Sequence, residues 1–598
     1  MALLLLAGHR RLQRLALTAV ISLIIIFLLL PRLDRVPMSS RTWPSSPWVT
    51  YTRSSFDWAN RPQKHPILQS SMTRLPEGTP RELPRIQHQF SKLELDEAHN
   101  KTQGERRDAV RDAARKSWQT YREFAWGRDE LAPVQLTGVD SFSGWGATLF
   151  DALDVLWIMG LKKEFKQAVA VVGTVDWDKT TGDTCSLFET NIRYLGGLLA
   201  AYDLSHEEVL LRKAVELGDM LYAAFDTPNH MPANSFDFFK AKQGQLVADK
   251  RESSAAVGTL SMEFTRLSQI TGNPKYFSVI DNIKLELEKT QNSTNLPGMW
   301  PTFVDLQDNF LTPDTSFTLG AMADSAYEYL SKMYSLLGGL DQTYEKMHLK
   351  AMTTAKNNLL FRPMLPDSYP AVQPDILFSG TILSNTRIID LIPEVQHLGC
   401  FAGGMFALGG RLFKQEEHVK IGEQLARGCA WAYAAFPTGI MPEVSHIVPC
   451  EGGVDNLAPC EWNETRWRGG ATRGAAAEPT KLPKPFSDVR STGYLLRPEA
   501  IESIFILYRI TGKKDLLDIA WRMFQAVKKA TETKHAFSAI EDVRVVGDTV
   551  KLNSMESFWI AETLKYFYLT FSDPDLISLD DYVFNTEAHP FRIPKPTT

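Results

Sequence analysis

The chain has 598 residues, 44% of them hydrophobic and 23% charged, a composition that supplies a large buried core and excludes collagen-like, wholly disordered and disulfide-scaffold proteins. Its 65 Lys and Arg against 70 Asp and Glu give a formal net charge of −5, which excludes the basic surface typical of nucleic-acid-binding proteins. The sequence also lacks the motifs of zinc peptidases, P-loop nucleotide hydrolases and α/β-hydrolases. We therefore expect a neutral or small partner and no nucleic acid.

An apolar segment at residues 15–30 predicts a membrane anchor. It is interrupted only by Thr18 and Ser22, and three arginines precede it. Its sixteen residues fall just short of the roughly 17 to 25 that span a bilayer, so a cleaved signal peptide is the alternative. Because no small-residue cleavage site follows, we predict an uncleaved signal anchor. The arginines place the tail, residues 1–14, in the cytoplasm and the bulk of the chain in the lumen of the Golgi or the endoplasmic reticulum, as in a single-pass type II membrane protein.

Residues 31–104 are predicted to form an extended stem. Between residues 31 and 90 the sequence has nine prolines and eight arginines and no sustained period of 3.6 or 2 residues. Three N-x-S/T sequons, at Asn100, Asn292 and Asn463, support exposure to the lumen. We therefore expect the folded domain to occupy residues 105–598.

From about Arg106 the apolar residues fall at helical spacing, beginning with Val110, Ala114 and Trp118. Later segments repeat a helix, a glycine-containing turn and a second helix, and no strand–helix alternation with a glycine-rich phosphate turn appears. The pattern predicts an all-α array of stacked helical hairpins. Whether such an array stays an open solenoid or closes into an α/α toroid is left open by the sequence.

The five cysteines contain no C-x-x-C pair and do not indicate a zinc site. Cys400 and Cys429 lie in two apolar segments that could be adjacent helices, and Cys450 and Cys460 flank a glycine-containing loop. In an oxidising lumen each pair could form a disulfide, and the alternative for each is two buried thiols. Cys185 is left over.

Three carboxylates stand out by their position. Glu189 precedes Arg193 by one helical turn, which by spacing alone predicts an exposed ion pair. Asp324 and Glu499 each stand near a predicted helix start, where a carboxylate ordinarily stabilises the helix dipole. Spacing alone therefore favours structural roles for all three.

The strings around these residues change that interpretation. GWGATLFDALDVLWIMG at 144–160, FET at 188–190 with LGGLL at 195–199, ADS at 323–325, LRPE at 496–499, AETLKY at 561–566 and FNTEAHP at 584–590 closely resemble glycoside hydrolase family 47, the class I α-1,2-mannosidases. The resemblance runs in the family's order from about residue 106 to 592. It implies an (α/α)7 barrel, a calcium ion at its floor, and inverting hydrolysis of terminal α-1,2-linked mannose from high-mannose N-glycans. Residues 105–598 are then the catalytic domain.

Carried over position by position, the resemblance implies that Glu189 is the general acid, Glu499 the general base and Asp324 a third essential carboxylate. Inverting hydrolysis needs one carboxyl to protonate the leaving oxygen and another to activate water on the opposite ring face, about 6.5 to 9.5 Å away. Crowding several carboxylates would keep one of them protonated near neutral pH.

The other residues that the resemblance carries over surround the ion and the sugar. Thr586 matches the residue that binds calcium through its hydroxyl and carbonyl oxygens, a donor type that calcium accepts. Cys400 and Cys429 match the family's disulfide. The remaining matches are the carboxylates Glu443, Glu556, Glu562 and Glu587, the polar residues Arg193, His397 and Arg497, and Phe558, which packs beneath the terminal mannose.

The sequence departs from the endoplasmic-reticulum members of the family at Met322. Those members carry an arginine two positions before the aspartate that matches Asp324, and it contributes to the removal of a single mannose. Met322 resembles the Golgi and fungal members instead and predicts that several mannoses are removed. Residues 466–480 look like a loop insertion, which either is disordered or alters access of the glycan.

Two other functions compete with a mannosidase. The first is a lectin-like receptor of glycoprotein quality control, from the related branch that acts in endoplasmic-reticulum-associated degradation. That branch generally lacks the pair matched by Cys400 and Cys429, which argues against it. The second is a purely structural solenoid, which leaves the acidic residues inside the family-like strings unexplained.

Overall fold

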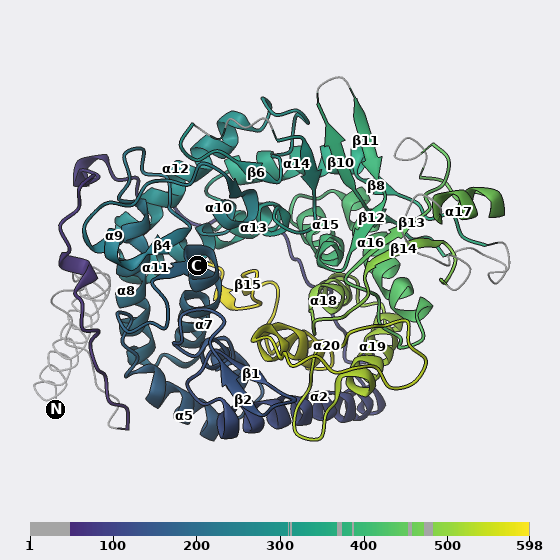
Figure 1. Ribbon diagram of the computed structural model, residues 1–598, viewed down its shortest axis with the longest axis horizontal. Coiled ribbons are helices and arrows are strands. Elements are labelled where there is room, and N and C mark those ends of the chain that lie inside the picture. The colour runs from purple at the N-terminus through teal and green to yellow at the C-terminus, as the bar shows by residue number, and fades with distance from the viewer. Residues whose placement is uncertain are drawn as a thin grey trace, which may run out of the picture.

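Paired helices form a closed ring in which one layer faces outward and the other faces the centre (Figure 1). The computed structural model describes residues 48–308, 310, 314–366, 374–385, 388–452, 457–471 and 482–596. The outer helices are α2 (Glu97–Phe124), α5 (Lys162–Val172), α8 (Glu208–Tyr222), α12 (Pro274–Thr290), α14 (Thr343–Asn358), α16 (Glu416–Ala435) and α19 (Asp515–Thr531). The inner helices are α4 (Leu153–Ile158), α7 (Gly196–Ser205), α11 (Ser261–Thr271), α13 (Asp324–Leu336), α15 (Ala402–Leu412), α18 (Glu499–Thr511) and α20 (Lys565–Thr570). The predicted all-α array of helical hairpins is confirmed.

The two layers differ in how their sequences distribute apolar residues. Every residue of inner helix α18 from Ala500 to Ile510 is buried. In outer helix α19 the buried residues recur at helical spacing, for example Leu517, Ala520 and Phe524, while the charged residues between them face the solvent. A helix covered on all sides is mostly apolar around its whole circumference, with Glu502, Ser503 and Arg509 as buried exceptions in α18, whereas a surface helix needs one apolar stripe.

Helix α2 closes the ring. It packs against α20 and against the π-helical turn η9 (Trp559–Leu564), the last helical elements of the chain. Trp118 and Trp559 are fully buried at this contact, and Trp559 Nε1 donates a hydrogen bond to Ser117 Oγ at 3.0 Å. The array is therefore a toroid, which answers the question that the sequence left open.

Short elements connect the helices at the ends of the ring. The remaining helical elements are α3 (Ala147–Asp151), α6 (Leu187–Glu189), α9 (Phe238–Lys242), α10 (Ser254–Gly258), α17 (Glu464–Ala471), η2 (Trp58–Asn60), η3 (Gln69–Ser71), η4 (Thr190–Leu195), η5 (Ala223–Phe225) and η6 (Leu398–Phe401). Two-stranded sheets pair β1 (Glu130–Ala132) with β2 (Thr137–Val139), β3 (Thr184–Ser186) with β4 (Ser235–Asp237), β5 (Glu252–Ser253) with β6 (Phe303–Val304), and β8 (Leu360–Phe361) with β9 (Phe378–Ser379). One three-stranded sheet joins β7 (Ser316–Thr318), β10 (Thr381–Ser384) and β11 (Ile389–Ile392), and another joins β12 (Glu394–Gln396), β13 (Val444–Ile447) and β14 (Phe486–Ser491).

The last hairpin of the chain lies inside the ring. Strands β15 (Tyr582–Phe584) and β16 (Pro590–Arg592) pair antiparallel, with Phe584 opposite Pro590. Figure 1 shows β15, in yellow, at the centre of the ring. The hairpin loop, residues 585–589, is thereby held among the inner helices.

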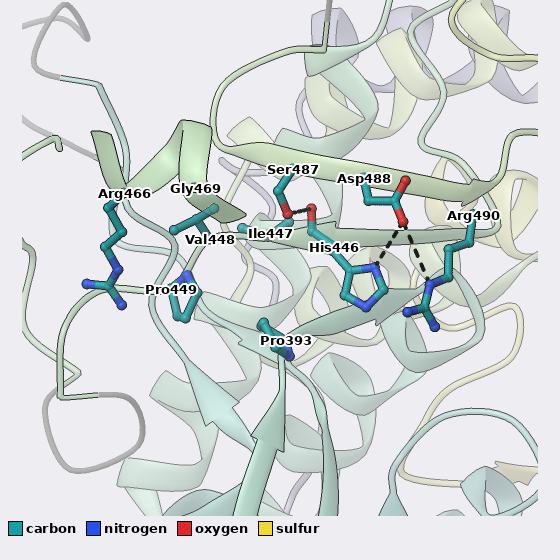
Figure 2. Close-up of a pocket in the computed structure, with 10 residues that line it drawn as sticks. All are labelled: Pro393, His446, Ile447, Val448, Pro449, Arg466, Gly469, Ser487, Asp488 and Arg490. Carbon is teal, nitrogen blue, oxygen red and sulfur yellow. Dashed lines mark hydrogen bonds and ion pairs between the residues drawn. The ribbon is translucent and has the colours of Figure 1, made fainter. Parts of the chain in front are cut away.

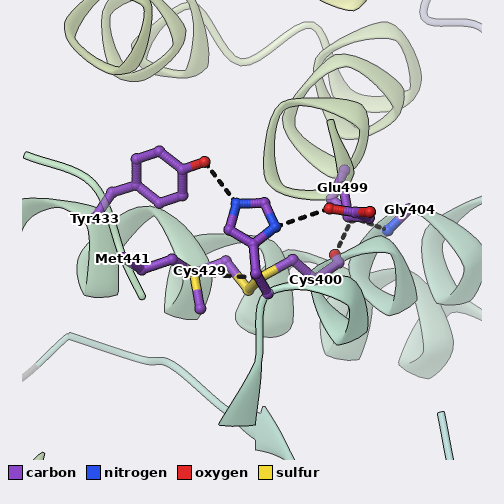
Figure 3. Close-up of a disulfide and its surroundings, with 8 residues drawn as sticks. Cys400, Gly404, Cys429, Tyr433, Met441 and Glu499 are labelled. Carbon is purple, nitrogen blue, oxygen red and sulfur yellow. Dashed lines mark hydrogen bonds and ion pairs between the residues drawn. A yellow bond between two sulfur atoms is a disulfide. The ribbon is translucent and has the colours of Figure 1, made fainter. Parts of the chain in front are cut away.

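Helices α15 and α16 approach each other more closely than side chains allow. A Cβ atom on Gly422 would lie 2.5 Å from the carbonyl oxygen of Gly403, so only glycine fits there. The Cys400–Cys429 disulfide crosslinks the same region (Figure 3). Elsewhere Cys450 pairs with Cys460. The Cys400–Cys429 disulfide that the resemblance implies is confirmed, and the Cys450–Cys460 pair, which the sequence left open, also forms a disulfide.

Removing the Cys400–Cys429 bridge with paired Cys→Ala substitutions is expected to lower the free energy of unfolding by about 3 to 4 kcal/mol, because a loop of this length then gains entropy in the unfolded chain. The bridge spans 29 residues, whereas Cys450–Cys460 spans 10 and serves as the matched control with a smaller expected loss. Guanidinium unfolding of the two variants measures the difference. A larger loss for the shorter bridge would contradict the expectation.

The predicted extended stem, residues 31–104, is described from residue 48 onward. Residues 48–96 form a strap along the domain, and α2 begins at Glu97, not near Arg106. Arg61 forms a buried ion pair with Asp226 at 2.7 Å, and Ser54 Oγ donates to Glu216 Oε2 at 2.6 Å. The segment has no helical or strand period because tertiary ion pairs, and not its own secondary structure, hold it in place.

Two further predictions fall wholly or partly outside the described residues. The anchor at 15–30 lies outside them, and the described part of the chain contains no helix long and apolar enough to cross a membrane. The insertion at 466–480 begins within α17, and its residues 472–480 are not described.

Candidate active site

Most of the residues that the sequence predicts to be functional line one cavity of about 400 Å³. Its walls come from α6 and the π-helical turn η4, from the starts of α13 and α18, from η9, and from the loop of the β15–β16 hairpin. The predicted residues that line it are Glu189, Arg193, Asp324, Arg497, Glu499, Phe558, Glu562, Thr586 and Glu587. His397 and Glu443 lie behind the cavity wall and do not line the cavity themselves. Each of them contacts a lining residue: His397 contacts Glu499, and Glu443 contacts Arg497.

Glu189 lies at the end of the short helix α6, whose first turn is capped by Ser186 Oγ accepting from the Glu189 backbone N–H. Arg193 Nε donates to Glu189 Oε2 at 2.8 Å. The predicted ion pair therefore forms, but its arginine is buried and also binds Glu587 at 3.0 Å. The pair belongs to the cavity wall and not to a solvated helix face. The intervening π-helical turn is a feature often found at functional sites.

Glu499, the first residue of α18, is held in its charged form. His397 Nδ1 lies 2.8 Å from Glu499 Oε2, and Tyr433 OH lies 2.7 Å from the other ring nitrogen of His397; Figure 3 shows Tyr433 and Glu499 on opposite sides of the imidazole. Burial raises the pKa of Glu499, but the hydrogen bond and charge of His397, with the charge of Arg497, outweigh burial and hold it below the ordinary value. Glu499 is therefore ionised at neutral pH, as a general base must be.

Asp324, at the start of α13, has the opposite character. Burial raises its pKa to about 7, the negative charges of Glu328 and Glu499 add to this effect, and the backbone N–H of Ser325 opposes it. A carboxyl that shares a site with an ionised neighbour stays protonated at higher pH. The cavity therefore brings together one ionised carboxyl and one that is partly protonated near neutral pH.

Two guanidinium groups flank Phe558. Arg193 and Arg497 each lie 5.8 Å from the centre of its ring. Glu443 fixes Arg497 by accepting from its Nε, and also accepts from the backbone N–H of Leu495 at 2.9 Å. Phe558 thus presents a rigid aromatic surface to the cavity, which suits the apolar face of a sugar ring.

The cavity also contains three carboxylates that the sequence did not predict, Glu252, Glu328 and Glu502. Glu328 follows Asp324 by four residues and Glu502 follows Glu499 by three, so each lies one helical turn from a predicted residue. This spacing is a signal that could have identified both. Glu556, in contrast, does not line the cavity; burial and the charge of Glu556 raise the pKa of Glu130 to about 8.

Several carboxyl groups that share the cavity with Thr586 form a buried acidic cluster. Burial raises the pKa of Glu587 to about 8, and burial together with neighbouring carboxylates raises the pKa of Glu562 and Glu502 well above the ordinary value. A bound cation would stabilise the charged forms of these groups. In the part of the chain that the structure describes, no three His, Cys, Asp or Glu side chains converge to hold a metal by themselves. The residues present fit a calcium ion held directly by Thr586 oxygens and otherwise by water.

The Thr586 loop is fixed by buried polar contacts. Tyr329 OH accepts from the Thr586 backbone N–H at 3.1 Å and donates to Glu263 at 2.7 Å. Asn585 Nδ2 donates to the same carboxylate at 2.8 Å, and Asn585 Oδ1 accepts from the backbone N–H of Glu587 at 3.0 Å. Glu263 is fully buried and was also missed, since nothing near it in the sequence marks it. These hydrogen bonds fix the conformation of the loop, and they form only when the ring is folded.

A buried ionic network contacts the loop of the β15–β16 hairpin. His589 Nδ1 and Lys565 Nζ lie 2.9 and 2.8 Å from Asp154 Oδ2, and Lys565 also donates to the carbonyl oxygen of Ala588. His589 Nε2 lies 3.2 Å from Asp151, which lies 3.6 Å from Arg193. The network joins the hairpin loop to the arginine that binds Glu189.

Replacing Lys565 by Met is expected to lower the free energy of unfolding by about 3 to 5 kcal/mol, because Asp154 then remains buried without its cation. The matched control is Lys513→Met, which removes an exposed lysine paired with Glu423 at 2.7 Å. Its expected loss is about 1 kcal/mol or less. Denaturant unfolding compares the two variants, and equal losses would show that the buried network does not stabilise the fold.

Comparisons with known proteins agree with this geometry. Residues 113–593 match Glycosyl hydrolase family 47. A mannosyl-oligosaccharide 1,2-alpha-mannosidase of Arabidopsis thaliana is 35% identical over 497 residues, covering 82% of this chain and 79% of that protein. The endoplasmic reticulum mannosyl-oligosaccharide 1,2-alpha-mannosidase of Homo sapiens is 34% identical over 497 residues, covering 82% of this chain and 64% of that protein.

Among solved structures, an alpha-1,2-mannosidase from Trichoderma reesei superposes with a TM-score of 0.72 at 31% sequence identity, covering 82% of this chain and 99% of that one. The resemblance seen in the sequence strings is thereby confirmed over most of the chain, including the inner helices and the hairpin that build the cavity. The protein belongs to glycosyl hydrolase family 47.

Proposed function

We propose that the protein is a mannosyl-oligosaccharide 1,2-α-mannosidase, which hydrolyses terminal α-1,2-linked mannose of high-mannose N-glycans with inversion of configuration. The observation that carries the proposal is the state of Glu499. It is largely covered, is held ionised by His397 and Arg497, and lies in one cavity with a second carboxyl, Asp324, whose pKa burial raises to about 7. Family membership and the names of the relatives supply the substrate class.

In the proposed mechanism Glu499 accepts a proton from a water molecule, and the water oxygen attacks the anomeric carbon of the terminal mannose. Glu189 donates a proton to the glycosidic oxygen from the opposite face, and the bond between that oxygen and the anomeric carbon breaks. Arg193 holds Glu189 in position, and Phe558 supports the apolar face of the sugar. The products are mannose with inverted configuration and a glycan shortened by one residue.

We propose that calcium binds beside this pair, through the hydroxyl and carbonyl oxygens of Thr586. When bound, the ion would supply a positive charge to sugar hydroxyls and water. Glu562 and Glu587 would accept hydrogen bonds from water near the ion, and Asn585 and Tyr329 fix the loop that presents Thr586. The support is the buried acidic cluster described above.

The acid and the base can be assigned by changing the leaving group. An α-mannosyl fluoride needs no proton donor, so Glu189→Gln is expected to hydrolyse it at near wild-type rate while losing most activity on the glycan. Asp324→Asn serves as the matched comparison, since its raised pKa makes it the other possible donor. Rescue of Asp324→Asn, and not of Glu189→Gln, by the fluoride would reverse the assignment.

A lectin-like function of glycoprotein quality control is the competing outcome. Incubation of the protein with a defined nine-mannose glycan, with and without a chelator, distinguishes the two. The proposal expects calcium-dependent release of mannose. Binding of the glycan without release would favour the lectin, although the Cys400–Cys429 bridge agrees with the enzyme.

We further propose the finer features of this enzyme. The alternation of outer and inner helices supports an (α/α)7 barrel. Met322 lines the cavity and is 46% exposed, so an apolar side chain stands where the endoplasmic-reticulum members carry an arginine, which supports removal of several mannoses as in Golgi and fungal members. Residues 15–30 anchor the protein as a single-pass type II membrane protein of the Golgi or the endoplasmic reticulum, with the catalytic domain in the lumen; an endoplasmic-reticulum relative supports the secretory pathway.

A further inference from the structure

Tyr433 approaches the catalytic cavity from the outer layer of helices. It lies in the last turn of α16, is 3% exposed, and places its hydroxyl oxygen 2.7 Å from His397 Nε2. On the other side of the imidazole, His397 Nδ1 lies 2.8 Å from Glu499 Oε2 (Figure 3). The Cys400–Cys429 bridge joins α16 to the segment that follows His397. A chain of two buried hydrogen bonds therefore connects the outer layer to Glu499.

The charge of Glu499 determines which nitrogen of His397 carries the proton. A carboxylate only accepts hydrogen bonds, so Nδ1 must be the donor to Oε2. In a neutral imidazole the other nitrogen, Nε2, then accepts, and the hydroxyl of Tyr433 donates to it. Burial raises the pKa of Tyr433 well above its ordinary value, so this hydroxyl keeps its proton at neutral pH.

Tyr494 packs beside the same imidazole and leaves this arrangement intact. The rings of Tyr433 and Tyr494 each have their centres 5.6 Å from the centre of the His397 ring. The hydroxyl of Tyr494 donates to the carbonyl oxygen of Arg497 at 3.1 Å. The proton of Tyr494 is thereby used, and the proton of Tyr433 remains for His397.

His446 shows how a histidine between carboxylates lies without such a hydroxyl (Figure 2). It lines a different cavity, of about 530 Å³, and lies 3.9 Å from Glu394 and 3.9 Å from Asp488, too far for hydrogen bonds. Its Nδ1 is buried and has no hydrogen-bond partner among the described residues. Neighbouring carboxylates alone do not fix this imidazole, whereas both ring nitrogens of His397 lie within hydrogen-bond distance of a partner.

We propose that Tyr433 is a positioning residue of the proposed mannosidase, which fixes His397 in the tautomer that donates to Glu499. The proposal rests on the function proposed above. The hydroxyl donates to Nε2, this bond polarises the imidazole, and Nδ1–H donates more strongly to Oε2. The other oxygen of Glu499, which lies 3.8 Å from Arg497, is left to accept the proton of water. Since the chain stabilises the charged form of Glu499, loss of the hydroxyl raises the pKa of Glu499.

Other charges near Glu499 come from several elements. Glu443 fixes Arg497 from the segment before β13, and Glu328 and Lys332 form an ion pair on α13. The remaining titratable groups that act on Glu499 are Asp324, Glu502, Glu562 and Tyr494. All of these groups are retained in Tyr433→Phe. A change in pH dependence in that variant therefore reports the lost hydroxyl.

Tyr433→Phe in the full chain removes the hydroxyl and keeps the ring. On a nine-mannose glycan with calcium, the ionisation that limits kcat/KM on the acid side is expected to move up by about one pH unit, because the charged form of Glu499 loses support. The base is protonated below that ionisation, so the deficit relative to the wild type grows as the pH falls. It should be less than about threefold at pH 7 and approach about tenfold at the acid end.

Tyr276→Phe is the matched control. Tyr276 is likewise buried, in outer helix α12, and its hydroxyl donates to Asp219 Oδ1 at 2.5 Å, but it does not line the catalytic cavity. Its pH profile should coincide with that of the wild type. A loss in Tyr433→Phe that is the same at every pH, or no loss at any pH, would overturn the proposal.

NMR of the full chain with ¹⁵N-labelled histidine tests the tautomer without relying on activity. The signals of His397 are those that disappear in His397→Gln. At pH 7 the wild type is expected to have a protonated Nδ1 and an unprotonated Nε2, and Tyr433→Phe should shift the Nε2 signal. A proton on Nε2 in the wild type, or unchanged His397 signals in Tyr433→Phe, would overturn the proposal. If the wild type releases no mannose, the proposed function fails, and the NMR result alone decides the role of Tyr433.

Discussion

Glu499→Gln is expected to lower kcat on a nine-mannose glycan by about 10³-fold, with little change in KM. An amide accepts no proton from water at neutral pH, so the base step is lost while the sugar contacts remain. The His397 hydrogen bond and the Arg497 charge, which hold Glu499 ionised in the wild type, cannot restore a base in the variant. Steady-state kinetics of released mannose measures the loss.

The matched control for this variant is Glu416→Gln. Glu416 is likewise the first residue of a helix, α16, but its side chain is 74% exposed on the outer layer. Its replacement should leave kcat unchanged. A Glu499→Gln protein that keeps more than about a tenth of wild-type kcat would exclude Glu499 as the base, since general-base catalysis contributes more than that.

Asp324→Asn is expected to raise the stability of the protein while lowering kcat by about 10²-fold or more. The pKa of Asp324 is about 7 in the folded protein and near 3.8 when unfolded, so the folded state binds the proton more tightly. Stability from this group is therefore lost as pH rises from about 4 to 7. Asparagine stays neutral at every pH. The free energy of unfolding of the variant therefore exceeds that of the wild type by an amount that grows over that interval and levels off above pH 7 at up to about 4 kcal/mol.

Unfolding free energies of the two proteins at pH 4, 5.5 and 7.5 test this expectation. The difference between them should be smallest at pH 4 and largest at pH 7.5. A constant difference across this range would show that Asp324 titrates normally in the folded protein, and a variant that keeps full activity would remove Asp324 from the catalytic set.

The helical ring could be predicted in part from the sequence, because apolar residues recur at helical spacing and glycine turns separate the helices. Its closure could not, since the contact between Ser117 and Trp559 joins residues at opposite ends of the domain. The contacts of residues 48–96 with the domain could not be predicted for the same reason. The Arg61–Asp226 pair links positions 165 residues apart, and no local pattern reports such a contact.

In the candidate site, too, some residues could be predicted from the sequence and others could not. Resemblance to the family placed Glu189, Asp324 and Glu499 together, although each has an ordinary structural interpretation by spacing alone. Glu328 and Glu502 could have been found from their position one turn along the same helices. Glu263 could not, because it supports the Thr586 loop only after a helix and the last hairpin meet inside the ring.

One measurement addresses most directly whether the cavity performs inverting cleavage. The protein from residue 48 onward, which keeps the strap that the domain requires, is mixed with a nine-mannose glycan and calcium, and the anomeric protons of released mannose are followed by NMR from the first minutes. We predict that β-mannose appears first and that α-mannose follows only by mutarotation. Initial release of α-mannose, or no release of mannose with calcium present, would contradict the proposed roles of Glu189 and Glu499.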